Sequence, residues 1–149
     1  MLKKTLPLLL FLFIISNSYT QSIEVCATCD VNSLTDAIAK SKPHDKITIK
    51  KGTYLESNVI IDKPLQIIGE GNPIIDGEKK GYVLIVKSDS VSVTGLVIKN
   101  PGKSYTKDYA AVYISQSNHF TFENNTLESV FFGFLIEKSH HGKIVKNHV

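Results

Sequence analysis

The sequence contains only two cysteines and one methionine, and it has little net charge. The methionine is Met1, which excludes a methionine-type copper site. Two of the 17 basic residues, Lys3 and Lys4, lie in an N-terminal leader, so 15 remain against 14 acidic residues, a net charge of about +1. A nucleic-acid partner would require a basic face. We therefore expect no nucleic-acid partner.

Long apolar runs are absent apart from one between Leu6 and Ile15. This run is shorter than the roughly 20 residues of a transmembrane helix. It follows the two lysines and precedes a small, polar segment at residues 16–20, which is the pattern of a secretory signal peptide. We predict an exported protein with a signal peptide over residues 1–20 and no membrane span after its removal. An uncleaved membrane anchor is the alternative. Residues 21–149 suffice for one domain.

The mature chain begins with one helical segment and continues with short β-rich runs. Ser33 and Asp36 resemble a capping box, and the apolar residues after Ser33 share one helical face, which predicts a helix over residues 33–42. Pro43 ends this helix. From there on, short runs rich in Val, Ile, Tyr and Phe alternate with Gly, Asn, Asp, Ser or Pro, which is typical of strands and turns.

These β-rich runs form an internal repeat. When Ser117 is aligned with Ser139, the other matching pairs are Ile114 with Ile136, Phe122 with Ile144, Asn125 with Asn147, and Leu127 with Val149. Earlier copies match at longer and unequal offsets, and would pair Ile85 with Ile114 and Val59 with Ile85. Such a repeat without intervening helices favours an all-β fold, a parallel β-helix in which each repeat is one rung.

We expect about three to four rungs, with the helix as an N-terminal cap and residues 101–109 as a loop that bulges from the solenoid. A leucine-rich repeat lacks the required leucine spacing, and a β-sandwich would not explain the positional matches. Ile144 and Val149 continue the apolar pattern to the end of the sequence. Since solenoids need polar end caps, we interpret residues 21–149 as a partial β-helix domain whose C-terminal rungs are missing, or whose open end meets a partner.

The two cysteines, Cys26 and Cys29, have the spacing C-x-x-C and are the first candidate site. In an exported protein they can form a disulfide, although so small a loop restrains the unfolded chain little. As thiolates they suit Cu(I), and two at this spacing can grip one ion. A thioredoxin-like motif requires a helix start at the pair, whereas here the helix begins several residues later. Copper binding and a plain disulfide therefore both remain open.

Histidines and carboxylates are the other candidates. The alignment of the last two repeats places His119 over His141 and His140 over Asn118, so the stacked imidazoles either hold a metal or are solvated turn residues. Glycoside hydrolysis requires two neighbouring carboxylates. In the predicted register no carboxylate stacks on another, and Asp76 faces Gly102. We therefore expect no enzymatic activity.

The segments "IEVCATC", "SLTDAIAKSKPHDKITIKKGTY" and "NVIIDKPLQIIGEGNPIIDGE" resemble the N-terminal part of the NosD family. The resemblance implies a right-handed parallel β-helix in the periplasm that works beside an ABC transporter in assembling the copper–sulfur centre of nitrous oxide reductase. It also implies copper as the bound metal and nitrous oxide reductase as a partner. The chain is shorter than typical members, which suggests an N-terminal fragment. A carbohydrate-binding or sugar-hydrolase-like β-helix is the alternative.

Overall fold

The computed structural model describes residues 21–149, so the expected signal peptide lies outside the described residues. Strand β1 (Ser22–Val25) precedes α1 (Leu34–Lys40), the one helix of the described part. The remaining strands are β2 (Lys46–Lys50), β3 (Thr53–Leu55), β4 (Val59–Ile61), β5 (Gln66–Glu70), β6 (Ile74–Asp76), β7 (Leu84–Val86), β8 (Ser92–Thr94), β9 (Val97–Lys99), β10 (Ala110–Ser115), β11 (Thr121–Glu123), β12 (Thr126–Glu128), β13 (Phe132–Glu137) and β14 (Lys143–Val145). Within residues 21–149, no helix has the length and apolar character needed to cross a membrane.

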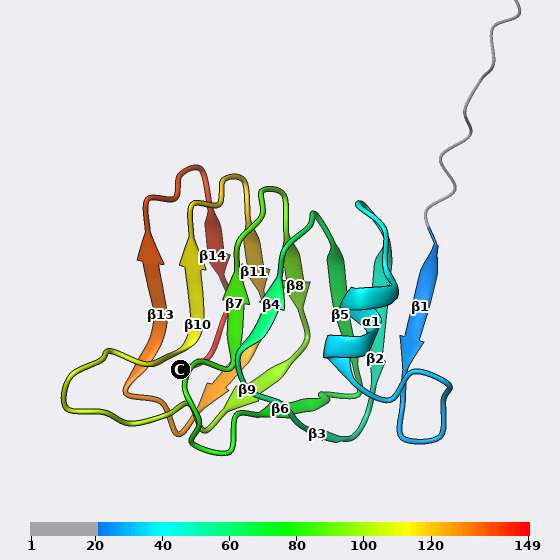
Figure 1. Cartoon of the computed structure of the whole chain (residues 1–149), viewed down its shortest axis with the longest axis horizontal. Coiled ribbons are helices and arrows are strands. Elements are labelled where there is room, and N and C mark those ends of the chain that lie inside the picture. The colour runs from blue at the N-terminus through cyan, green and yellow to red at the C-terminus, as the bar shows by residue number, and fades with distance from the viewer. Residues whose placement is uncertain (1–20) are drawn as a thin grey trace, which may run out of the picture.

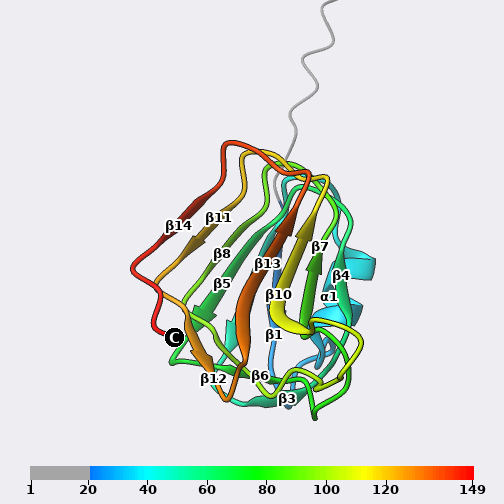
Figure 2. The same cartoon turned by 90° about the vertical axis from the view of Figure 1, so that its left-hand side faces the viewer.

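The strands form three parallel sheets that wind around one interior (Figures 1 and 2). Sheet A has the order β1-β2-β5-β8-β11-β14, sheet B the order β12-β9-β6-β3, and sheet C the order β13-β10-β7-β4. Each pass of the chain visits the sheets in the same sequence, which confirms the predicted parallel β-helix. The solenoid has about five turns rather than three to four, because β1 and β2 add to sheet A before the first repeat that the sequence matches detect.

Inward-facing residues stack along the solenoid axis and form the core. In sheet A, Ile47 pairs with Ile67, Ile67 with Val93, and Val93 with Phe122, and all four side chains are fully buried. Strand alternation places every second residue inside, so the repeated apolar positions make one continuous ladder. Burial of each such side chain contributes about 1.5–3 kcal/mol.

Helix α1 closes the N-terminal end of this core. The Ser33 hydroxyl accepts a hydrogen bond from the Asp36 N–H at 3.1 Å, and the Glu56 carboxylate accepts the N–H groups of Leu34 and Thr35. These contacts satisfy backbone donors that a helix start leaves free. The helix packs against β1, β2 and β4, and continues sheet C beyond its last strand (Figure 1). The predicted capping helix is therefore confirmed, with slightly narrower bounds.

The register confirms the alignment of the last two repeats but corrects two earlier matches. Ile114 pairs with Ile136, as expected, whereas Ile114 also pairs with Val86 rather than Ile85, and Val59 with Leu84 rather than Ile85. In both cases the partner in sheet C lies one position away from the one that the register of sheet A implies. The connection from sheet C to sheet A is therefore one residue longer after β7 than after β4, and one residue longer after β10 than after β7. After β13 it has the same length as after β10.

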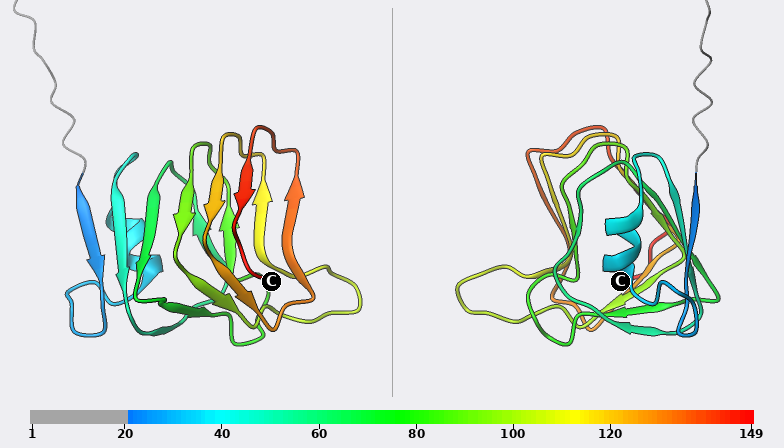
Figure 3. Two further views of the ribbon diagram at one scale, coloured as in Figure 1. Left: turned by 180° about the vertical axis from the view of Figure 1, so that it is seen from behind. Right: turned by 45° about the vertical axis from the view of Figure 1, so that its right-hand side comes forward.

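Two further expectations concern the surface of the solenoid. Residues 101–109 form a connection between β9 and β10 that extends away from the body (Figure 3). At the C-terminal end, Ile144 is 39% and Val149 is 80% exposed. The predicted bulging loop and the apolar character of this end are both present.

Candidate metal centre

The cysteine pair lies where the chain leaves β1. The Cys29 N–H donates to the Cys26 carbonyl at 3.2 Å, and the Cys26 N–H donates to the Val31 carbonyl at 3.2 Å, so a tight turn brings the two Cα atoms to 5.0 Å. The two sulfur atoms are joined by a disulfide. The structure therefore holds the oxidised form of the pair. Its sulfur atoms become thiolate ligands only after reduction.

Glu24 adds a third donor to this pair. Its Oε1 atom lies 3.7 Å from the Cys29 sulfur, and the ligand atoms of Glu24, Cys26 and Cys29 all fall within 4.8 Å of one another. Within residues 21–149, no other three His, Cys, Asp or Glu side chains meet in this way. Glu24 was not predicted from the sequence, although positions 24 and 26 are two residues apart and strand alternation places such residues on one side.

A row of three charged side chains, with Lys50 between Glu24 and Glu70, lies beside the cysteine pair. The Lys50 ammonium lies 3.3 Å from Glu24 Oε2 and 2.7 Å from Glu70 Oε2, and the three residues come from neighbouring strands β1, β2 and β5. The hydrogen bonds that the Lys50 ammonium donates to Glu70 and Glu24 raise the pKa of Lys50, and the hydrogen bond from Lys50 lowers the pKa of Glu70. Lys50 therefore stays protonated and offsets part of the negative charge that two thiolates and Glu24 would bring together.

The site opens to solvent through a hollow of about 490 Å³. Glu24, Thr28, Cys29 and Lys40 of α1 are among the residues that line it. The Thr28 hydroxyl lies 3.6 Å from the Cys26 sulfur. A volume in the range of small-ligand sites leaves room for a metal donor or a reductant to reach the pair. Once the disulfide is reduced, the two sulfurs fit a soft metal ion such as Cu(I), and the Glu24 carboxylate adds a harder donor beside them.

The structure confirms that His119 stacks on His141. Their ring centroids are 5.1 Å apart and their planes differ by 11°, at the corner where sheet C leads into sheet A. The His140 N–H donates to Asn118 Oδ1 at 3.1 Å, as the same alignment of repeats predicts. The lone pairs of parallel rings lie in parallel planes and do not converge on one point. Metal binding by His119 and His141 stays a prediction, and the stacked arrangement favours solvated turn residues.

Asp76 faces Lys99, not Gly102. It pairs with Lys99 in the register, its carboxylate lies 3.6 Å from the Lys99 ammonium, and both of its oxygens accept hydrogen bonds from the Asn100 amide at 3.0 Å. Burial opposes ionisation of Asp76, but the Asn100 and Glu78 hydrogen bonds and the Lys99 charge outweigh it and lower the pKa. The predicted pairing of Asp76 with Gly102 is wrong because the connection from sheet A to sheet B is shorter before β9 than before β6. Asp76 therefore stabilises a turn.

Comparison with known proteins identifies a family and several solved structures with a similar fold. The family model described as periplasmic copper-binding protein (NosD) matches residues 15–149. A Pseudomonas aeruginosa protein named "Probable ABC transporter binding protein NosD" is 23% identical over 124 residues, which cover 76% of this chain and 29% of that protein. The chain therefore spans less than a third of the length of this relative.

Two crystal structures of pectin methylesterase, one with hexasaccharide VII and one of a mutant with hexasaccharide IV, superpose with a TM-score of 0.64 each. They are 16% and 15% identical to this chain, cover 80% and 85% of it, and are themselves covered over 46% and 49% of their lengths. At such identity the likeness shows the β-helix fold alone.

Proposed function

Because the chain belongs to the NosD family of periplasmic copper-binding proteins, we propose that it helps to assemble the copper–sulfur centre of nitrous oxide reductase. In this proposal it is an exported, periplasmic protein without enzymatic activity, and copper is its cargo. The observation that carries the proposal is the convergence of Cys26, Cys29 and Glu24 at an open site.

Copper binding requires reduction of the Cys26–Cys29 disulfide. An external dithiol supplies two electrons and two protons, becomes a disulfide itself, and leaves two thiols on this chain. Binding of one Cu(I) then releases the two thiol protons, since thiolates are the ligands. Soft sulfur donors select Cu(I). Lys50, held between Glu24 and Glu70, moderates the resulting negative charge.

Work beside an ABC transporter is part of the same proposal. The Pseudomonas aeruginosa relative is named as a probable ABC transporter binding protein, and the family description is periplasmic. A β-helix offers flat faces on which a membrane transporter and a reductase can bind at the same time.

A carbohydrate-binding or sugar-hydrolase-like β-helix is the competing function. The pectin methylesterase neighbours share the fold but only 15–16% of residues. The Asp76 carboxylate forms an ion pair with Lys99 and accepts a hydrogen bond from the Asn100 amide. Screening the protein against acidic and neutral polysaccharides separates the two functions, since only the competing function predicts binding or cleavage.

The test of the proposed function is deletion of the gene and complementation in the host. We expect reductase purified from the deletion strain to lack its catalytic copper–sulfur centre, and the wild-type gene to restore that centre. C26S/C29S should fail to restore it, whereas A27S, which alters an exposed residue between the two cysteines, should succeed. Normal maturation of the reductase in the deletion strain would contradict the proposal. If C26S/C29S restores the copper–sulfur centre, the two cysteines have no part in the proposed function.

A further inference from the structure

The outer face of sheet C carries an apolar row that the proposed copper site does not use. Ile60, Ile85, Tyr113 and Leu135 occupy equivalent positions on the four strands of the sheet. The residues on either side of Ile60, Ile85 and Tyr113 are buried, so strand alternation directs this row outward. Ile60 is 47% exposed. A contiguous apolar row on the outside of a protein marks an interaction surface.

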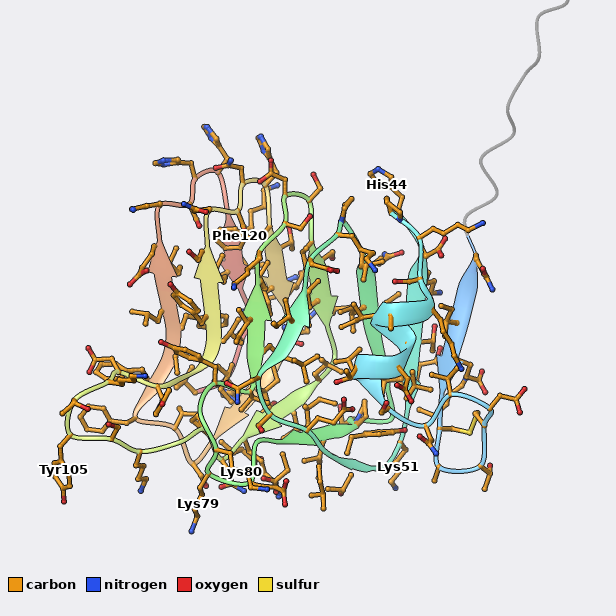
Figure 4. The ribbon with its side chains drawn as sticks, viewed as in Figure 1. His44, Lys51, Lys79, Lys80, Tyr105 and Phe120 are labelled. Carbon is orange, nitrogen blue, oxygen red and sulfur yellow. A yellow bond between two sulfur atoms is a disulfide. The ribbon has the colours of Figure 1, made fainter. Side chains whose placement is uncertain are left out.

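Three tyrosines gather at one edge of this row. The Tyr82 and Tyr113 rings stack with their centroids 4.7 Å apart and their planes 18° apart, and Tyr109 meets Tyr82 edge-on at 5.2 Å. Tyr109 ends the loop of residues 101–109, whose Tyr105 points away from the body at the loop tip (Figure 4). Half-buried tyrosines in rigid packing are the side chains that most often anchor protein interfaces.

Two carboxylates lie beside these rings. The Tyr113 hydroxyl donates to Glu137 Oε2 at 2.6 Å. Burial raises the pKa of Tyr82, and Tyr113, Glu137, Tyr109 and Asp108 raise it further. In the described part of the chain, neither Glu137 nor Asp108 forms an ion pair. Both carboxylates therefore keep their capacity to bind a cation.

A groove of about 530 Å³ continues from the tyrosines between the loop and the start of β13. Tyr109 and Asp108 line one side of it, and Val130, Phe131 and Phe132 line the other. The loop lysines Lys103 and Lys107 line it as well. The groove thus extends the apolar and aromatic surface beyond the edge of sheet C.

We propose that this sheet C patch, defined as Ile60, Ile85, Tyr113, Leu135, Tyr82, Tyr109, Glu137 and Asp108, docks a protein segment with an arginine or lysine flanked by apolar side chains. Aromatic rings and carboxylates together bind such a cation by cation–π attraction and charge-assisted hydrogen bonds. The aliphatic row binds the neighbouring apolar side chains. A saccharide is less well matched, because Ile60, Ile85 and Leu135 offer it neither hydrogen bonds nor aromatic faces. The proposal stands independently of copper binding.

The test uses a display library of random dodecapeptides panned against the full chain, followed by binding of the enriched peptides with a terminal tryptophan. The chain contains no tryptophan, so tryptophan fluorescence reports the peptide alone. We expect enriched peptides to contain Arg or Lys beside apolar residues. We expect D108N/E137Q to bind them roughly tenfold more weakly, as the loss of charge-assisted contacts requires.

The matched control is E123Q, which removes one carboxylate from the outer face of sheet A, where Glu123 pairs with Lys146. It should bind the peptides as the wild type does. Y113F, which keeps the ring and loses the hydroxyl, should bind them more tightly than Y113A does. Absence of enriched peptides, enrichment of sequences without basic residues, or equal binding by D108N/E137Q overturns the proposal. The proposal is also overturned if the wild type binds neutral or acidic oligosaccharides and Y113A does not, because the patch would then be a glycan-binding surface.

Discussion

The side-chain amide of Asn125 donates a hydrogen bond to Oδ1 of Asn147, 3.0 Å away and one turn later in the solenoid. The same oxygen accepts the Asn125 backbone N–H at 2.9 Å. On its other side, Asn125 accepts the Leu96 N–H and donates to the Val93 carbonyl, each at 3.0 Å. Asn125 is 1% exposed. One buried side chain thus joins three successive turns at the corner between sheets A and B.

Replacement of Asn125 by leucine should lower the free energy of unfolding by about 2–4 kcal/mol, because the Leu96 N–H and the Val93 carbonyl lose their partners inside the protein. Urea titrations followed by circular dichroism measure the change. The control is N124G, at an exposed neighbour with φ 53°, which glycine adopts freely. N124G should stay within about 0.5 kcal/mol of the wild type. Equal stability of N125L would show that the asparagine ladder does not support the fold.

Gly69 and Gly95 stack in adjacent turns of sheet A with no room for a side chain. A Cβ atom at Gly69 would lie 2.2 Å from the Gly95 carbonyl oxygen, which belongs to the backbone and cannot rotate away. We expect G69A to cost about 3 kcal/mol or more, at the upper end of overpacking effects. At Gly52 a Cβ would meet only the Tyr54 ring at 3.4 Å, so G52A serves as the tolerated control. A G69A protein as stable as G52A in urea would contradict this close approach.

Asp45 makes the stability of the N-terminal end dependent on pH. Its buried carboxylate accepts the Lys42 N–H at 2.7 Å and the Gln21 N–H at 2.9 Å, and the Lys42 hydrogen bond is the main cause that lowers its pKa below 3.8. The folded pKa is lower than the unfolded one, so ionised Asp45 stabilises the protein above pH 3.8. This stabilisation disappears as the pH falls through the folded pKa.

D45N should therefore be less stable than the wild type at neutral pH, and the difference should shrink as the pH falls below 3.8. Thermal unfolding of both proteins between roughly pH 2 and pH 7, a range that spans the carboxyl pKa, measures the difference. D62N changes an exposed carboxylate and should show no such dependence. A stability difference for D45N that stays constant over the whole range would exclude the role of its charge.

Glu24 should matter more for a divalent ion than for Cu(I). A carboxylate is a hard ligand and Cu(I) prefers soft sulfur, so E24Q should leave Cu(I) affinity of the reduced chain within about threefold but weaken Zn²⁺ binding roughly tenfold. Competition titrations with chelators for each ion measure this. E70Q is the control and should change neither affinity strongly, because Glu70 contacts the same lysine but lies two strands further from the cysteines than Glu24. Unchanged Zn²⁺ binding by E24Q would exclude Glu24 as a direct ligand, and an equally strong loss for Cu(I) would contradict the expected preference.

The repeat could be read from the sequence because inward residues recur wherever the turns keep their length. The match of Asn125 with Asn147 holds because the strands of sheets C and A are offset by the same amount in the last two turns. The match of Val59 with Ile85 fails because a corner there gains one residue. A slip of one residue exchanges inside and outside, so apolar matches alone do not fix the register of a solenoid with unequal corners.

The candidate metal centre was predicted only in part for a similar reason. Cys26 and Cys29 are close in sequence and visible as a motif, whereas Lys50 and Glu70 reach the site only because β1, β2 and β5 are neighbours in sheet A. The sheet C patch was not predicted at all. Its members come from β4, β7, β10, β13, the connection before β7 and the loop of residues 101–109. An outward isoleucine such as Ile60 looks like a core residue until the register is known.

The central claim is that the reduced cysteine pair binds copper, and anaerobic titration of the reduced chain with Cu(I) against a competing chelator tests it most directly. We expect one tightly bound equivalent in the wild type, in A27S and in H119A/H141A, and none in C26S/C29S or in the oxidised wild type. Identical titrations of the wild type and C26S/C29S would contradict the claim. Cys26 and Cys29 would then form only a disulfide, and the function of the protein would lie on the faces of its β-helix.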